Sequence, residues 1–386
     1  MSRGAVLLAA AVVFFGAGVA AHGLMFEPAR VWPNLLLDGF NLLSLAVAGL
    51  FFLAAARLTG ARWSAGLRRI PEALMLALPV AAVLMLALYF GREILYTWSH
   101  QGAFAHDSPL AGRAHYLTVV GVFGRAAGTF VIWTFCAWWL RRLSLGQDRD
   151  PAGSLTYHHR LNTAAAVFVV LFAPSFTCTA YDWLISLEPH WFSTMFAVYV
   201  FAGTFVQGIA AVALMTVGLH RNGLLGDAAG ERQLHDLGKM LFAFSTFWAY
   251  IWVSQYLLIW YGNIPEEITY YARRTEGPWL VLFALNFVIN WVLPFTVLLS
   301  AKAKCKPRVL AVVAASLLVG HWLDLYLMIM PAREPTPVAG IYEVAIAAGY
   351  LALAYLVVGA NLRRAPLVPL ADPVMAHERQ RAAMSA

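Results

Sequence analysis

The sequence predicts an all-α, polytopic membrane protein with about ten transmembrane helices. Hydrophobic residues make up 61% of the 386 residues and charged residues only 12%, which leaves too little polar surface for a soluble body of this size. About ten apolar runs, separated by short charged loops, are each long enough to cross a hydrocarbon core of ~30 Å. These observations favour one membrane domain over the two or three soluble domains that the length alone would suggest.

Helices are expected at residues 5–21, 34–57, 72–92, 116–140, 162–186, 191–218, 237–260, 278–300, 308–330 and 338–361. The first run also fits a signal peptide, because Arg3 precedes it and small residues lie before His22. A retained helix is preferred, since it gives an even number of spans that agrees with the loop charges. Residues 1–365 would then form the membrane domain. Residues 366–386, rich in proline, alanine and charge, would form a mobile cytoplasmic tail.

The basic residues indicate the orientation of the chain in the membrane. The two ends of the chain and the loops after the second, fourth, sixth and eighth spans contain twenty Lys and Arg residues, and the other loops contain six. The positive-inside rule therefore predicts that both termini are cytoplasmic. The sequence pI is 9.4, but the basic residues form no patch with interleaved aromatic residues, so nucleic acid is not an expected partner.

No metal or haem is expected to be bound by this chain alone. Cys136, Cys178 and Cys305 lie far apart without a C-x-x-C pair, which argues against a disulfide framework, a zinc site and an iron–sulfur cluster. Only His321 falls well inside a predicted helix, whereas a b-type haem needs two histidines that face each other. No nucleotide-binding or hydrolase motif occurs in a suitable context.

Charged residues inside the predicted spans are the strongest functional signal, because charge in a bilayer is costly. At ~1.5 Å per residue, every strongly ionisable group placed within the membrane falls between its midplane and the periplasmic surface. His321 and Asp324, at i and i+3, would be able to share a proton or a hydrogen bond. The candidates for proton transfer are Asp38, Arg125, Asp182, His321, Asp324 and Glu343.

Two interpretations of these charges remain open. They could line a water-accessible pocket, or half of a proton path, that opens to the periplasm. Alternatively, Arg125 pairs with one acid, the others reach the interface, and none titrates in function. Asp38 and Asp182 are the weakest candidates, because acids at helix ends also occur where they simply face lipid head groups.

Polar and aromatic side chains on two further helices are candidates for ligand contacts. Trp248, Trp252 and Gln255 form a helical stripe that could line a quinol pocket, although aromatic belts at membrane interfaces are the commoner cause of such residues. Asn286 and Asn290, at i and i+4, are expected to make interhelical hydrogen bonds rather than to bind a ligand.

Three segments carry a family resemblance: "YDWLISLEPHWFSTMFAVYV" at 181–200, "SQYLLIWYGNIPEE" at 254–267 and "HWLDLY" at 321–326. Together they resemble the membrane subunits of alternative complex III, a bacterial quinol:cytochrome c oxidoreductase, which are of the NrfD/polysulfide-reductase type. The resemblance extends over essentially the whole chain. Of the two membrane subunits in this family, ActC and ActF, the chain looks more like ActF, because "RWSAGLRRIPEAL" at 62–74 is similar to the segment before the third helix there.

The resemblance implies two four-helix bundles with peripheral helices, in a multi-pass protein of the bacterial inner membrane. It also implies a scaffold and proton-conducting role, carried by the matched positions Asp182, His321 and Asp324, with a possible share in a quinol site. The partners would be an ActC-like membrane subunit, an iron–sulfur subunit, cytochrome c subunits and a terminal oxidase. Iron–sulfur clusters and haem c would lie in those partners, and the substrate would be menaquinol or ubiquinol. A purely structural membrane anchor and a stand-alone secondary transporter remain as alternatives.

Overall fold

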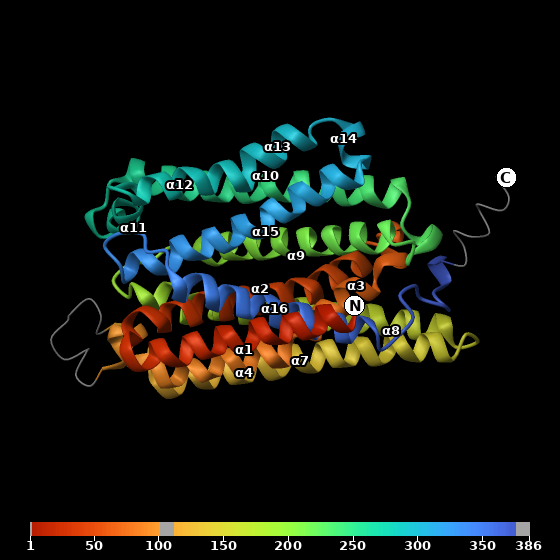
Figure 1. Cartoon of the computed structure of the whole chain (residues 1–386), viewed down its shortest axis with the longest axis horizontal. Helices are drawn as coiled ribbons and strands as arrows, with labels where there is room; N and C mark the ends of the chain where they lie inside the picture. Colours follow the sequence, from red (N-terminus) through yellow and green to blue (C-terminus); the bar gives the residue numbers. More distant parts are fainter. Residues whose placement is uncertain (1, 101–111, 376–386) are drawn as a thin grey trace.

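The computed structural model describes residues 2–100 and 112–375 (Figure 1). Within these ranges the chain is helical and contains no strand, and ten segments are long and apolar enough to cross a membrane. The predicted fold class is therefore confirmed: the protein is an all-α polytopic membrane protein. Asp107, an acidic residue in the expected loop between the spans at 72–92 and 116–140, lies outside the described residues.

The spans are α1 (Arg3–Phe26), α2 (Pro28–Leu58), a third span made of α3 (Arg69–Met75), α4 (Leu78–Ala87), η2 (Leu88–Gly91) and α5 (Arg92–Leu95), α7 (Val119–Arg149), α8 (Ser154–Trp183) with η4 (Ile185–Leu187), α9 (Phe196–Arg221), α10 (Glu231–Gly262), an eighth span made of α12 (Trp279–Phe287), the π-helical η6 (Val288–Val292) and α13 (Leu293–Leu298), α15 (Pro307–Ile329) with η7 (Met330–Ala332), and α16 (Ile341–Leu362). Shorter helices are η1 (Arg62–Leu67), η3 (Thr97–Ser99), η5 (Gly226–Ala228), α11 (Pro265–Thr275) and α14 (Ala301–Cys305).

The spans pack in two groups of four. The second to fifth spans, from α2 to α8, form one group, and the sixth to ninth spans, from α9 to α15, form the other (Figure 1). The helices α2 and α9 join the two groups, and α1 and α16 lie together outside them. Small residues permit the central contact, because a Cβ atom at Gly208 of α9 would lie only 2.5 Å from the Cβ of Ala48 of α2.

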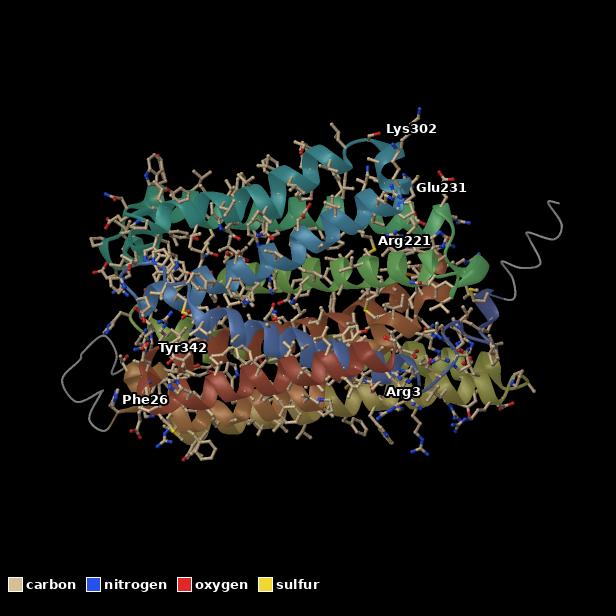
Figure 2. All side chains as sticks on the ribbon, in the orientation of Figure 1. Arg3, Phe26, Arg221, Glu231, Lys302 and Tyr342 are labelled. Carbon is tan, nitrogen blue, oxygen red and sulfur yellow. The ribbon has the colours of Figure 1, made fainter. Side chains whose placement is uncertain are left out.

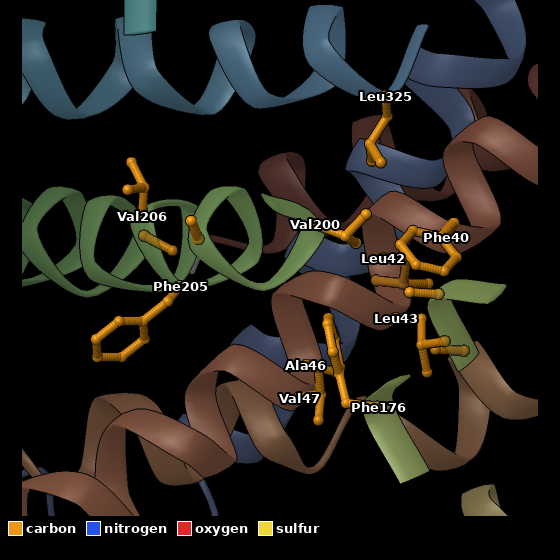
Figure 3. Close-up of a cluster of buried hydrophobic side chains, with 14 of the residues drawn as sticks. Phe40, Leu42, Leu43, Ala46, Val47, Phe176, Val200, Phe205, Val206 and Leu325 are labelled. Atoms are coloured by element: carbon orange, nitrogen blue, oxygen red, sulfur yellow. The ribbon is translucent and has the colours of Figure 1, made fainter. Parts of the chain in front are cut away.

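Apolar side chains fill the space between these helices. Figure 3 shows part of this buried cluster, with Leu43 and Val47 of α2 and Val200 of α9 among its members. Phe205 and Val206 project from opposite sides of α9, so that this helix presents apolar groups in several directions. The core therefore runs along α2 and α9, and any polar group on these helices has to find a partner inside the protein.

The two ends of the bundle differ. Arg3, Arg221 and Lys302 lie toward one end, called the basic end below (Figure 2). Phe26 and Tyr342 lie toward the other, which also carries α11 and is called the α11 end (Figures 1 and 2). The alternation of loops between the two ends agrees with the alternation of charge in the sequence.

Several helices are longer at the basic end than expected. The helix α7 continues to Arg149, and α8 begins at Ser154, although the apolar runs suggested residues 116–140 and 162–186. The additional turns contain polar side chains that are buried against other polar groups, including Ser144 and Gln147. A boundary derived from hydropathy alone omits such turns.

The connection between α10 and the eighth span contains an amphipathic helix, α11, that was not expected from the apolar runs. Pro265 occupies its first turn, followed by Glu266 and Glu267, and Arg273 and Arg274 occupy its last turn. Proline at the start, acids near the N-terminus and arginines near the C-terminus all stabilise a helix. The residues at its two ends could therefore have predicted this helix from the sequence.

The segment 366–375 differs from the expected mobile tail, because it packs against the basic end. Asp372 is buried and accepts a hydrogen bond from Arg68 at 2.6 Å. The backbone N–H of Leu370 donates to Asp148 at 3.1 Å. The remainder of the predicted tail, residues 376–386, lies outside the described residues.

Candidate functional site

Asp324 of α15 is the centre of the candidate site, and its side chain is fully buried. Its Oδ1 accepts a hydrogen bond from the hydroxyl of Tyr199 on α9, and another from the amide of Asn286 on α12 at 2.7 Å. Its Oδ2 accepts a bond from the indole N–H of Trp248 on α10 at 3.0 Å. In the part of the chain that the structure describes, no arginine or lysine forms an ion pair with Asp324. Uncharged donors from three spans thus satisfy this carboxyl group.

A second layer orients Asn286. Asn290, one turn further along and within the π-helical η6, donates to the Asn286 side-chain oxygen at 2.7 Å. This bond fixes the Asn286 amide so that its nitrogen faces Asp324. Gly320 of α15 gives Asn290 its space, because a Cβ atom there would lie 2.5 Å from the Asn290 side-chain oxygen. The predicted interhelical role of the two asparagines is thus seen for Asn286, which bonds to Asp324 of α15.

His321 lies one turn before Asp324 and is also buried. Neither ring nitrogen has a hydrogen-bond partner among the described residues. The hydrogen bond expected between His321 and Asp324 is therefore not formed here, because donors from other helices occupy the carboxylate oxygens. The imidazole faces Gly203 of α9, where a Cβ atom would lie 2.9 Å from Nδ1.

The predicted aromatic stripe meets the carboxylate through one residue. Trp248 bonds to Asp324, and Trp252 stacks on Trp248 with ring centroids 6.1 Å apart. Trp252 also packs against Phe283 of α12 at 4.6 Å. Gln255 is buried one turn further along α10. The structure therefore brings the three quinol-pocket candidates to one side of the Asp324 site.

Asp38 of α2 lies on the other side of α15. Its Oδ1 accepts a hydrogen bond from the indole of Trp322 at 2.8 Å, and its Oδ2 has no partner among the described residues. The helix α15 therefore makes polar contacts with two helices: Trp322 bonds to Asp38 of α2, and Asp324 bonds to Tyr199 of α9. Asp38 is 1% exposed, so it does not face lipid head groups.

Polar residues continue from this region along α2 and α9. Thr204 of α9 lies 3.4 Å from Ser44 of α2, hydroxyl to hydroxyl. Gln207 of α9 donates to the Asn41 side chain at 2.7 Å. We call the full set the polar seam: Asp38, Asn41, Ser44, Tyr199, Thr204, Gln207, His321 and Asp324.

The other predicted candidates form two separate ion pairs nearer the α11 end. Asp182 accepts two hydrogen bonds from Arg125, at 2.8 and 3.0 Å. Arg125 also reaches the backbone oxygen of Tyr116 at 3.1 Å, so it extends toward the end of the span. Glu343 accepts two bonds from Arg30, at 2.7 and 2.8 Å. These four charges are paired, and the structure does not bring them into the polar seam.

A group of charges at the basic end was not expected from the apolar runs. Glu72 of α3 is 0% exposed and accepts a hydrogen bond from Arg69 at 2.5 Å. Arg141 and Ser144 of α7 also donate to this carboxylate. Arg68 lies 3.9 Å from it. Glu72 and Arg141 lie at the ends of the expected spans 72–92 and 116–140, and the helices continue beyond those ends in the structure.

An arginine outside the spans holds the end of α15 near Asp324. Arg274 of α11 is buried and donates to the backbone oxygens of Leu327 at 2.8 Å and Met328 at 3.0 Å. It also forms an ion pair with Glu188 at 2.8 Å. Burial raises the pKa of the neighbouring Tyr270, so this tyrosine stays neutral beneath the guanidinium. The last carbonyls of α15 are thus satisfied by a cation, which also suits the helix dipole.

Sequence reasoning missed Tyr199, Thr204 and Gln207 of the seam. Tyr199 lies within one of the three quoted segments, but its hydroxyl had no assigned partner. Thr204 and Gln207 are uncharged, and threonine and glutamine are common in transmembrane helices. Thr204 and Gln207 share one face of α9 by their spacing, as Asn41 and Ser44 share one face of α2. That these two faces meet is known only from the structure.

Comparison with protein-family models and with curated proteins returns no match, so the role of the site is argued from its own geometry and from the sequence. Fold and site together define a multi-pass membrane protein with a buried carboxyl group held by neutral donors. Among the described residues, no group of three or more His, Cys, Asp and Glu side chains is arranged to hold a metal ion.

Proposed function

We propose that the protein is an integral membrane subunit of a respiratory quinol:cytochrome c oxidoreductase of the alternative complex III type. In this proposal it acts as a scaffold and as a proton-conducting element. Iron–sulfur clusters and haem c lie in partner subunits, beside an ActC-like membrane subunit. The similarity of the segments at 181–200, 254–267 and 321–326 supports the assignment to such a complex.

The observation that carries the proton-conducting role is the environment of Asp324. It is fully buried in a span, and its partners are a tyrosine, a tryptophan and an asparagine. A buried carboxylate that only supports structure is usually paired with a cation, as Asp182 and Glu343 are here. Asp324 has no such partner among the described residues, so it can gain and lose a proton without leaving a cation unpaired.

The polar seam places further polar side chains next to Asp324, along which a proton could move. From Tyr199 to Gln207, α9 advances about 12 Å from near the α11 end toward the middle of the bundle. His321 adds a ring whose nitrogens have no partner among the described residues, within one turn of Asp324. Imidazole and hydroxyl groups can exchange protons with neighbouring water, and the amides of Asn41 and Gln207 can orient such water. Beyond Gln207 the buried face of α9 is lined by Ile209, Ala210 and Val212, so the seam spans only part of the membrane.

The test combines isolation of the complex with a matched pair of variants. Purification in mild detergent should recover haem-bearing subunits with this chain, detected by a haem stain. Asp324→Asn keeps the shape of the side chain and should lower quinol:cytochrome c turnover or proton release in reconstituted complexes. Thr179→Val, which removes a buried hydroxyl of α8 outside the seam, serves as the control.

Two outcomes would redirect the proposal. Wild-type turnover and proton release in Asp324→Asn would reduce the chain to a membrane anchor. Purification without any haem-bearing subunit would favour a stand-alone transporter. That second candidate has one observation behind it, since the π-helical η6 interrupts the eighth span next to Asn286, and interrupted helices are common at transporter binding sites.

A further inference from the structure

A cavity of about 480 Å³ lies between α2, α9 and α10, and Asp324 is not among its lining residues. Its size is that of a small-molecule site. Its lining is almost wholly apolar, and six of the residues are phenylalanines. The lining residues are Phe51, Phe52, Ala55, Ala56, Thr59, Ala61, Trp63, Phe201, Phe205, Met240, Phe244 and Phe247.

The cavity is elongated along the spans. On α2 its lining runs from Phe51 to Thr59, about 12 Å along the helix axis. On α10 it runs from Met240 to Phe247, about 10 Å. One end is at Ala61 and Trp63, where α2 has finished and the chain turns at the basic end. The cavity therefore begins at the level of the membrane surface and extends inward.

The walls are built from mutually packed rings. Phe51 meets Phe201 edge to face, with centroids 4.9 Å apart, and Phe205 meets Phe244 edge to face at 4.6 Å. The lining offers little for a polar ligand, because the Thr59 hydroxyl already donates to the backbone oxygen of Ala55 at 2.8 Å. An apolar cavity of this kind does not hold water stably. Its occupant must be a flexible, linear, apolar chain.

A cation is next in the chain to the lining residues at one end of the cavity. Arg62 is exposed, lies between the lining residues Ala61 and Trp63, and forms no ion pair with any residue that the structure describes. On the α10 side, Lys239 is paired with Asp236 at 2.5 Å, so that pair adds no net charge. A guanidinium at this level suits a phosphate group, which it can bind through two parallel hydrogen bonds.

We propose that this cavity binds one acyl chain of an anionic phospholipid, whose phosphate contacts Arg62. A lipid chain is already in hydrocarbon, so transfer from water contributes nothing to its retention. Retention rests on close contacts with the aromatic walls and on the charge-assisted bond at the surface. The bound lipid would fill the space between the two groups of spans, where α2, α9 and α10 meet.

The first experiment counts lipids by native mass spectrometry of the full chain after a detergent wash. Protein reconstituted in phosphatidylglycerol vesicles should retain a phospholipid, and protein from phosphatidylcholine vesicles should retain it less well. Ala55→Phe and Ala56→Phe fill the cavity and should weaken retention at least about tenfold. Ala11→Phe, on an exposed position of α1, is the matched control and should retain the lipid.

Two further measurements separate lipid binding from loss of fold. Arg62→Gln should abolish the preference for phosphatidylglycerol, and Arg62→Lys should restore most of it. In the wild type, phosphatidylglycerol with a photoreactive diazirine on its acyl chain should label peptides of α2, α9 and α10 at the lining residues. Uniform labelling over all spans, or equal retention by the wild type and both filled variants, would overturn the proposal.

Discussion

Asp324 and Glu72 are both fully buried carboxylates, and the protein satisfies them in opposite ways. Asp324 receives hydrogen bonds from a tyrosine, a tryptophan and an asparagine on three spans. Glu72 receives them from Arg69, Arg141 and Ser144, with Arg68 nearby. The first environment contains no charge to balance the carboxylate among the described residues, whereas the second contains several.

The two environments differ in what a change of protonation would cost. Neutralising Glu72 would remove the carboxylate that pairs with Arg141 and leave Arg68 and Arg69 with Asp148 and Asp372 alone, which is strongly unfavourable. Burial alone already lowers the pKa of the Arg68 guanidinium, so the surrounding acids have to hold it charged. Neutralising Asp324 leaves only uncharged donors, which lose hydrogen-bond strength but no ion pair. The basic end therefore depends on its charges for stability, whereas in the proposed function the polar seam is the region where a charge can change.

The largest effect on stability is expected from Glu72→Gln. The variant keeps the volume of the side chain but removes the counter-charge of Arg141 and one of the two carboxylates that pair with Arg69, and breaking a buried pair costs about 3–5 kcal/mol. Thermal unfolding in detergent should show a large decrease in melting temperature. Asp324→Asn makes the same chemical change at the other carboxylate and is the control. Equal melting temperatures for the two variants would show that the two carboxylates do not differ in their contribution to stability.

A smaller effect is expected from Arg125→Gln. It leaves Asp182 buried without its cation, but Arg125 is 29% exposed, so lipid head groups and water can compensate in part. The yield of assembled protein should fall more than turnover per assembled molecule. Arg92→Gln, which disrupts an exposed pair with Glu93, is the matched control and should assemble normally. Normal yield together with impaired turnover in Arg125→Gln would instead place this arginine in the proton path.

The seam itself should lose little stability when one donor is removed. Tyr199→Phe deletes one hydrogen bond to Asp324 and should cost on the order of 1 kcal/mol, as should Asp324→Asn. Because the two residues are in direct contact, the double variant should be less destabilised than the sum of the single variants. Denaturant titrations of the four proteins measure this coupling. Strict additivity would contradict the hydrogen bond as a source of stability.

The smallest effect is expected from Asp372→Asn. Arg68 keeps Glu72, Gln147 and Asp148 as partners, so the bundle should melt at nearly the wild-type temperature. The segment 366–375 should nevertheless become easier to cleave, because its main charged contact is lost. Limited proteolysis followed by mass spectrometry detects this change. Unchanged cleavage would mean that Ser154 and Asp148, which bond the backbone of Ala371, hold the segment without Asp372.

The number of spans and their approximate positions in the sequence were predictable because each apolar run is long, and length and hydropathy decide whether a helix crosses a bilayer. Asp324 could be selected as a candidate for the same reason, since a charge in such a run stands out. Its partners were not. Tyr199 and Trp248 are amphipathic residues that occur widely in membrane helices, and only the packing of α9 and α10 against α15 aims them at one carboxylate. The network around Glu72 was missed because hydropathy ends a helix where charges begin, although buried charges can extend it.

The contact between α1 and α16 has a consequence for how the chain is made. Gly16 of α1 lies so close to α16 that a Cβ atom there would be 2.6 Å from the backbone oxygen of Ala345. Arg30 and Glu343, joined at 2.7 Å, are 313 positions apart in the sequence. During synthesis α1 therefore lacks its contact with α16 until α16 has emerged from the ribosome. Completion of α16 supplies the main partner of α1, so a translation product that lacks α16 leaves α1 with only its smaller contact to α2 and more open to quality-control proteases.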